Sequence, residues 1–130
     1  MTDIKFRAKS KATNSWVYGF YAFVDGQHYI IQGAMFYTAH DNGTSLSFND
    51  WDEVKGETVS QWTGLKDQRL APIFYGDILN NEESNNVEVW YDDGATLVGR
   101  KDSFDEYLYQ ITASKLFIIG NVQDNSDLLT

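Results

Sequence analysis

The sequence contains no cysteine among its 130 residues. This excludes disulfides, thiolate chemistry and zinc sites built on cysteine. Secreted proteins of this size often depend on disulfides, so the absence favours the cytoplasm. Residues 1–6 lack the apolar run of a signal peptide, and no stretch approaches the roughly 20 apolar residues that span a bilayer. We therefore expect a cytoplasmic protein with no membrane attachment.

Basic residues are scarce: 10 lysines and arginines stand against 19 acids, for a net charge of −9. Such a field repels phosphate backbones and anionic lipid, and it suits solubility or a basic protein partner. Four of the basic residues, Lys5, Arg7, Lys9 and Lys11, nevertheless lie close together. We expect at most weak, salt-dependent binding of duplex DNA at this cluster.

Motifs of catalysis are also absent. His28 and His40 are the only histidines, and neither has the spacing of a metal ligand pair. There is no Gly-x-Ser-x-Gly elbow, no phosphate-binding loop and no calcium loop, and Asp92-Asp93-Gly94 is explained by turn chemistry. We expect no enzyme, no cofactor and no metal site; a hydrolase would require His28 or His40 to cluster with carboxylates.

Aromatic residues are abundant: 8 Tyr, 8 Phe and 4 Trp make up 15% of the chain. Aromatic and β-branched side chains suit half-buried pleated surfaces, which favours an all-β fold. The strongest local signal is a hairpin over residues 16–31, turning at Asp25-Gly26. Its register places Phe20 opposite Ile31 and Phe23 opposite His28. Both faces of this hairpin are apolar, so it is buried on both sides or one side is an interface.

Further strands are expected over residues 4–8, 46–48, 58–63 and 115–122, with an acidic loop at 49–53. A second hairpin, 87–92 with 95–99, turns at Asp93-Gly94 and pairs Trp90 with Leu97. Residues 104–111 fit one helical turn or a strand equally well. Short strands separated by turns indicate a small barrel or sandwich. A soft boundary near Glu57 gives an N-terminal β-hairpin unit, 1–57, and a C-terminal unit, 58–130, which may share one core.

Three blocks of sequence together resemble the YopX family of phage and prophage proteins. They are residues 4–8 with 16–19 and 28–31; residues 61–67 with 73–78; and residues 119–122 with 128–129. The resemblance implies an all-β architecture with an SH3-like barrel in the C-terminal part, and a phage or prophage in a bacterial host as the source. It implies no established activity and supplies no catalytic residues.

These observations predict a non-enzymatic binding module that acts through protein–protein contacts, either with itself or with a host or phage protein. The surplus aromatic residues motivate this reading, because they are hard to bury in so short a chain. The alternative is weak association with single-stranded nucleic acid through base stacking. A third reading, an acidic mimic of DNA, rests on charge alone. The candidate contact residues are Tyr18, Tyr21, Trp62, Tyr75 and Trp90.

Overall fold

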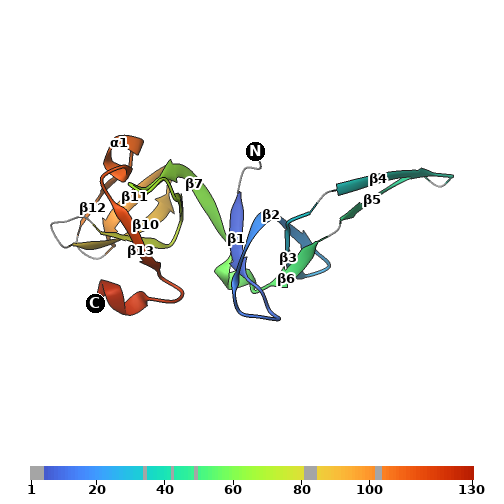
Figure 1. The fold of residues 1–130 in the computed structure, drawn as a ribbon, viewed down its shortest axis with the longest axis horizontal. Coiled ribbons are helices and arrows are strands. Elements are labelled where there is room, and N and C mark those ends of the chain that lie inside the picture. Colours follow the sequence, from blue (N-terminus) through green and yellow to red (C-terminus); the bar gives the residue numbers. More distant parts are fainter. Residues whose placement is uncertain (1–4, 34, 42, 49, 81–84, 102–103) are drawn as a thin grey trace. The chain divides into compact units, whose positions relative to one another are not determined.

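The structure, a computed structural model, describes residues 5–33, 35–41, 43–48, 50–80, 85–101 and 104–130. It is built from antiparallel strands, so the all-β prediction is confirmed. The chain divides into two compact units, Met1–Val59 and Ser60–Thr130 (Figure 1). Within the described residues, no helix is long and apolar enough to cross a membrane.

The first unit contains a sheet in the order β6-β3-β2-β1. Its strands are β1 (Phe6–Lys9), β2 (Trp16–Val24), β3 (Gln27–Ile31) and β6 (Trp51–Val54). β2 and β3 form the expected hairpin, with Phe20 opposite Ile31 and Phe23 opposite His28. Its turn has positive φ at Asp25 (51°) and at Gly26 (78°), the conformation that a two-residue hairpin loop demands.

The inner face of this sheet forms the core of the first unit. Ala8, Ile30 and Val54 are fully buried, and Phe6, Val17, Tyr21 and Val59 pack against them. The chain that follows β1 then reaches β6: Ser10 bridges Val54, and the Lys11 amide donates to the Glu53 carbonyl over 3.0 Å. The 3-10 turn Gly56–Thr58 ends the segment, and the Thr58 hydroxyl accepts a hydrogen bond from the Lys9 amide. The sheet therefore wraps around its own core.

Between β3 and β6 lies a two-stranded ribbon, β4 (Met35–His40) with β5 (Gly43–Phe48). The short strand expected at residues 46–48 is the second half of this ribbon, whereas β4 was not predicted. The acidic loop expected at residues 49–53 is wrong, because Trp51–Val54 forms β6. The two consecutive acids of this segment, Asp52 and Glu53, are tolerated at a sheet edge, where β3 supplies the pairing.

The second unit contains a five-stranded sheet in the order β12-β11-β10-β9-β13, and it also contains the paired strands β7 and β8, which are not part of that sheet. The strands are β7 (Ser60–Lys66), β8 (Pro72–Phe74), β9 (Asp77–Asn80), β10 (Asn86–Asp92), β11 (Ala95–Arg100), β12 (Phe104–Tyr107) and β13 (Phe117–Asn121). The short helix α1 (Gln110–Ala113) precedes β13, and the 3-10 turn Ser126–Leu129 ends the chain. The hairpin at Asp93-Gly94 has the predicted register, with Trp90 opposite Leu97.

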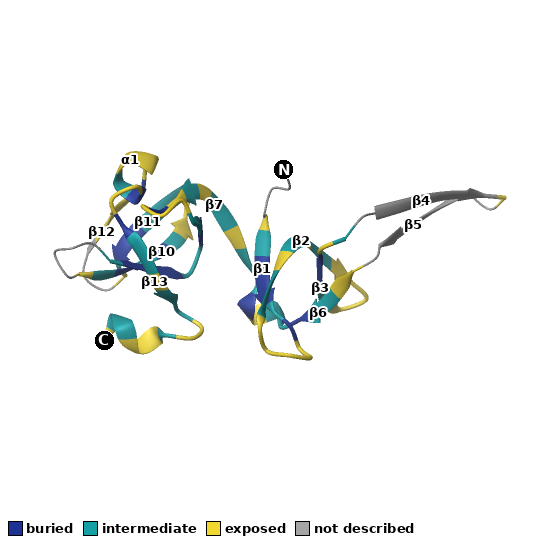
Figure 2. Cartoon of the chain, viewed as in Figure 1, coloured by how far each residue is buried: buried dark blue, intermediate teal, exposed yellow. Residues whose placement is uncertain are grey.

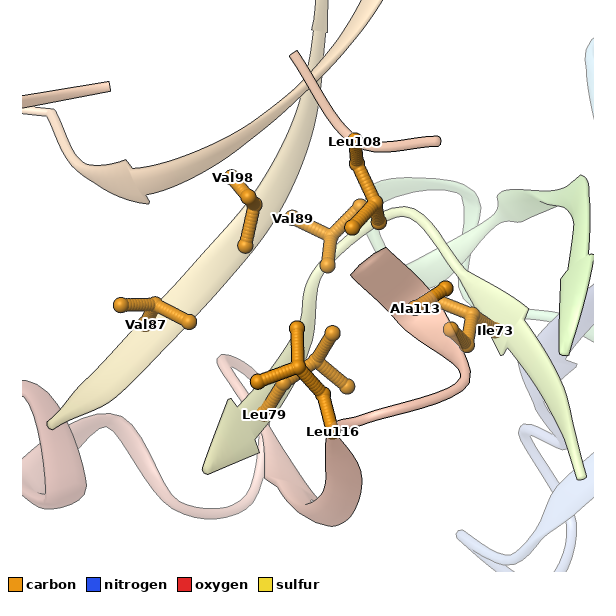
Figure 3. Close-up of a cluster of buried hydrophobic side chains, with 8 residues drawn as sticks. All are labelled: Ile73, Leu79, Val87, Val89, Val98, Leu108, Ala113 and Leu116. Carbon is orange, nitrogen blue, oxygen red and sulfur yellow. The ribbon is translucent and has the colours of Figure 1, made fainter. Parts of the chain in front are cut away.

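Aliphatic side chains from the five-stranded sheet, from β8, from α1 and from the segments that flank α1 make the core of the second unit (Figure 3). The buried members are Ile73, Leu79, Val87, Val89, Val98, Leu108, Ala113 and Leu116. Among the described strands, β12 and β13 are the two edges of the sheet, and no pairing between them closes it into a barrel. The closed barrel expected for this unit is therefore not observed, and its SH3-like character stays a prediction.

Two buried carboxylates fix loops in the second unit. Asp67 accepts backbone N–H groups from Arg69 (2.9 Å), Ala71 (2.9 Å) and Ile118 (3.1 Å), which ties the β7–β8 connection to β13. Asp77 accepts the Phe74 amide over 2.8 Å at the Gly76 turn. Both acids have a structural role, because both oxygens of Asp67 and Oδ2 of Asp77 satisfy backbone donors inside the fold.

Candidate functional site

The outer face of the β2–β3–β6 sheet carries a row of apolar side chains. Successive residues of a strand point to opposite faces. Since Tyr21 and Ile30 belong to the core side, Phe20, Ala22 and Val24 of β2 lie on the outer side, together with Tyr29 and Ile31 of β3. The register continues to β6, where Trp51 lies opposite Ile31. Three strands therefore contribute to one continuous outer surface.

These residues enclose a shallow groove of about 250 Å³, which we call the β2–β3–β6 groove. Its lining consists of Ala22, Val24, Tyr29, Ile31 and Trp51. Ile31 is only 7% exposed and forms the floor, whereas Val24 is 52% and Trp51 55% exposed. Figure 2 colours the strands of this unit by the burial of each residue. The Trp51 ring meets Tyr29 edge-to-face, with the ring centroids 5.3 Å apart. Phe20, the β2 neighbour of Ile31, is 49% exposed beside the groove.

Charged groups border the groove without entering it. On the β6 side, Lys11 Nζ lies 2.6 Å from Glu53 Oε2. Asp52 lies opposite Ile30, on the core side of the sheet, and accepts a hydrogen bond from Gln32 over 3.3 Å. Glu53 raises the pKa of Lys11 above 10.5, chiefly through their side-chain hydrogen bond. The lining itself has no acid, base or amide side chain, and its polar side-chain groups are the Tyr29 hydroxyl and the Trp51 indole N–H. Such a surface suits the burial of apolar side chains from a partner.

Of the predicted contact residues in the first unit, Tyr18 is exposed and Tyr21 is engaged internally. Tyr18 lies on the outer side of β2, 42% exposed. Tyr21 lies on the inner side, where its hydroxyl is 2.6 Å from Nδ1 of His28 and its ring packs at 5.7 Å from that of Phe6. The structure therefore places these two tyrosines on opposite faces of one strand, so they do not form a common surface.

The other three predicted residues, Trp62, Tyr75 and Trp90, lie in the second unit and are half-buried. The Trp62 indole donates to the Leu65 carbonyl over 3.0 Å. The Tyr75 hydroxyl pairs with that of Thr96 at 2.8 Å. The Lys101 ammonium lies 5.6 Å from the Trp90 ring centroid. These contacts give each residue a structural role inside its own unit.

Sequence reasoning missed the residues that line the groove. The sequence did indicate an apolar surface for the groove residues of β2 and β3, because the hairpin at residues 16–31 is apolar on both faces. That signal did not say which face would be covered. Trp51 was missed because residues 49–53 were interpreted as a loop, whereas pairing with β3 brings this side chain against Tyr29.

His28 is packed among aromatic rings. Besides the Tyr21 hydroxyl, its neighbours include the Phe23 ring, 4.8 Å away, and the backbone of Gly56. The side chain of His40 lies outside the described residues. Within the part of the chain that the structure describes, no group of three or more His, Asp or Glu residues is arranged to hold a metal ion.

A second hollow, of about 230 Å³, opens beside the core of the second unit. Its walls are formed by Asn85, Val87, Val98, Glu106, Thr112, Lys115 and Leu116. Glu106 and Lys115 are exposed at its rim, while Val98 and Leu116 are buried core residues. The hollow is thus an opening onto the core with a mixed polar edge.

The comparisons with known proteins identify the family. The sequence matches the YopX protein family over residues 5–130. The chain belongs to the YopX family. A crystal structure of protein EF1440 from Enterococcus faecalis has a similar fold, with a TM-score of 0.64, 24% sequence identity and coverage of 100% of both chains. No match was found among curated proteins. The YopX match confirms the resemblance inferred from the three sequence blocks.

Proposed function

We propose that this YopX-family protein is a non-enzymatic binding module of a phage or prophage, and that it acts in the host cytoplasm through protein–protein contacts. The β2–β3–β6 groove is its docking surface. One observation carries the proposal: an outer sheet face leaves large apolar side chains exposed although the same strands bury a core on their other face. A contiguous exposed apolar patch on a soluble chain is typical of an interaction site.

The chemistry of the groove supports a protein partner. Trp51 and Tyr29 offer aromatic surface next to an aliphatic floor, the composition that dominates the buried centre of protein interfaces. Charges stand only at the border, where the Lys11–Glu53 pair stays in solvent. A partner that covers the groove would bury apolar surface without stripping water from an ion pair.

For the second unit we propose an SH3-like sheet. Its support is the five antiparallel strands in the order β12-β11-β10-β9-β13, with the short helix α1 inserted before the last strand. The bulge between Ile118 and Gly120 bends β13 where it pairs with β9. A curved sheet of this kind encloses its own core, which leaves the first unit to provide the docking surface.

The experiment compares Val24→Asp, in the groove, with Ile111→Asp, at a site in the second unit that is 76% exposed. Both variants add one negative charge at an exposed aliphatic position, so they are matched. Each immobilised chain captures proteins from an Enterococcus faecalis lysate, and sedimentation velocity measures self-association. We expect Val24→Asp to lose a partner, itself or another protein, that Ile111→Asp retains. Identical binding by wild type and both variants would refute the proposal.

A second candidate function, association with single-stranded nucleic acid, is favoured by the β1–β2 pair. Lys9 and Arg7 lie opposite Trp16 and Tyr18, and the Arg7 guanidinium stands 4.6 Å from the Trp16 ring centroid. Basic groups beside aromatic rings are the elements of base-stacking surfaces. A fluorescence titration with a labelled oligonucleotide tests it. Binding at low salt that Lys9→Glu weakens would support this function; absence of binding at low salt would remove it.

A further inference from the structure

The β4–β5 ribbon pairs only with itself among the described strands. Its six residue pairs run from Met35 opposite Phe48 to His40 opposite Gly43. A two-stranded hairpin alone in water is marginally stable, because it has no second layer on which to bury an apolar face. In Figure 1 the ribbon continues from the ends of β3 and β6 as a separate two-stranded element. The ribbon therefore needs a covering surface.

The register gives the ribbon two different faces. Alternate residues of a strand share a face, so positions 35, 37 and 39 fall together with their cross-strand partners 48, 46 and 44. The residues at these positions are Met35, Tyr37, Ala39, Phe48, Leu46 and Thr44. The opposite face holds Phe36, Thr38, His40, Ser47, Ser45 and Gly43. By sequence pattern the ribbon is amphipathic, with one apolar and one mainly polar face.

A break in register lies at the base of the ribbon, so the alternation of faces in β3 and β6 does not continue unchanged into β4 and β5. Ile31 lies opposite Trp51, and an unbroken ladder would then bring Met35 opposite Ser47, whereas it lies opposite Phe48. Four steps along the chain lead from Ile31 to Met35 but only three from Trp51 back to Phe48, so the extra residue is on the β3–β4 side. The Asp50 carbonyl accepts two amides there, from Gln32 (2.8 Å) and Gly33 (3.3 Å), and Asp50 has a positive φ of 57°.

Charge selects the kind of surface that can meet this ribbon. The chain carries a net charge of −9, so two copies repel each other unless the facing surfaces are nearly uncharged. Residues 33–48 contain a single acid, Asp41 at the tip, and no lysine or arginine. The β2–β3–β6 groove lining has no charged residue either. The ribbon and the groove can therefore meet in two copies of this acidic chain without bringing like charges together.

The amount of apolar material also fits a dimer. Each ribbon offers four large apolar residues on one face, and each groove offers exposed Val24 and Trp51 beside Phe20. An aromatic side chain can bury about 150–250 Å², and a stable interface takes about 800 Å² per partner. One ribbon on one groove falls short of that area. Two reciprocal contacts reach it.

We propose that the β4–β5 ribbon of one copy lies in the β2–β3–β6 groove of a second copy, and the reverse, in a two-fold dimer. This inference rests on the proposed function, since it takes the groove as the docking surface and names its occupant. A two-fold arrangement uses the same two surfaces on both copies and closes on itself, which prevents open chains of molecules.

The decisive experiment mixes two variants of the full chain. Leu46→Asp places a charge on the ribbon, and Val24→Asp places one in the groove. We expect wild type to sediment as a dimer at micromolar concentration and each variant alone to dissociate at least tenfold more readily. The equimolar mixture associates more strongly than either variant alone, because a mixed pair keeps one contact with both surfaces unaltered, but less strongly than wild type, which has two such contacts. Ile111→Asp, the control, stays dimeric. A mixture that remains as monomeric as its components would refute the inference.

Cross-linking provides a second measurement that does not depend on disrupting the fold. Because the chain has no cysteine, single thiols can be introduced by Leu46→Cys and Val24→Cys. A short bis-maleimide reagent should join these two variants in a mixture, at least tenfold faster than it joins Leu46→Cys to Ile111→Cys. Equal rates would overturn the inference.

The outcomes separate this inference from the proposed function. A monomeric wild type overturns the dimer. If that monomer still captures a protein that Val24→Asp loses, the groove remains a docking surface with another occupant. If it captures none, both proposals fail.

Discussion

The backbone of Gly56 packs directly against the imidazole ring of His28, so a Cβ atom at position 56 would overlap that ring. The ring is held on its other sides by the Tyr21 hydroxyl, 2.6 Å from Nδ1, and by the Phe23 ring. We expect Gly56→Ala to lower the free energy of unfolding by about 1–3 kcal/mol, the usual cost of overpacking. Urea unfolding, monitored by tryptophan fluorescence, measures this change in the free energy of unfolding.

The same relationship provides its own control. In a His28→Ala background the space behind residue 56 is open, so adding Gly56→Ala should cost much less. Glu57→Ala, at an exposed neighbour, should leave stability within about 0.5 kcal/mol of wild type. An equal cost of Gly56→Ala in both backgrounds would show that the ring contact is not the cause.

Asp67 holds together a loop that the sequence alone did not explain. Its carboxylate accepts three backbone N–H groups, two within the β7–β8 connection and one from Ile118 of β13. Asp67→Ala would leave these donors without their partner, and we expect a loss of about 3 kcal/mol or more. Asp92→Ala, at an exposed position, is the matched control. Thermal unfolding measures the midpoint temperature of each variant. If both substitutions lowered this temperature by the same amount, the structural role of Asp67 would be contradicted.

Elements set by local turn chemistry were predictable from the sequence. Asp25-Gly26 and Asp93-Gly94 both adopt positive φ, and each fixes the register of its hairpin without help from distant residues. Residues 104–111 could not be assigned, because they split into β12 and α1 within eight positions. Periodicity needs a longer run than either element provides.

The docking surface was only half predictable, for a physical reason. The alternation in β2 and β3 showed two apolar faces, but the choice of the covered face depends on Ala8 and Val54, which lie far away in sequence. β6 was missed because Asp52 and Glu53 look like loop residues. At the sheet edge, Asp52 accepts a hydrogen bond from Gln32 and Glu53 forms an ion pair with Lys11. The backbone of this segment pairs with β3 and so forms a strand. Tertiary pairing overrode local propensity there.

The Lys11–Glu53 pair predicts a small pH dependence. Glu53 raises the pKa of Lys11, so the pair stabilises the fold while Lys11 is charged, and this contribution disappears as the pH rises through the raised pKa. The stability difference between wild type and Glu53→Gln should therefore be constant near neutrality and shrink above pH 10.5. Both groups are largely in solvent, so added salt should also reduce it. A difference that grows with alkaline pH would contradict the assignment.

Val24 and Ile31 share the outer face of the β2–β3 hairpin but should respond oppositely to substitution. Ile31 is 7% exposed at the floor of the groove, so Ile31→Ala should cost about 2–4 kcal/mol in unfolding free energy whatever the chain binds. Val24 is 52% exposed, so Val24→Lys should leave the stability of the isolated chain within about 0.5 kcal/mol of wild type. Its effect should appear only at protein concentrations that favour association, because a bound partner adds stability by mass action. Denaturant unfolding at two concentrations a hundredfold apart distinguishes the two roles. A concentration-independent loss at Val24 would mean that this side chain serves folding, and the outer face would then be part of the core and not a surface for docking.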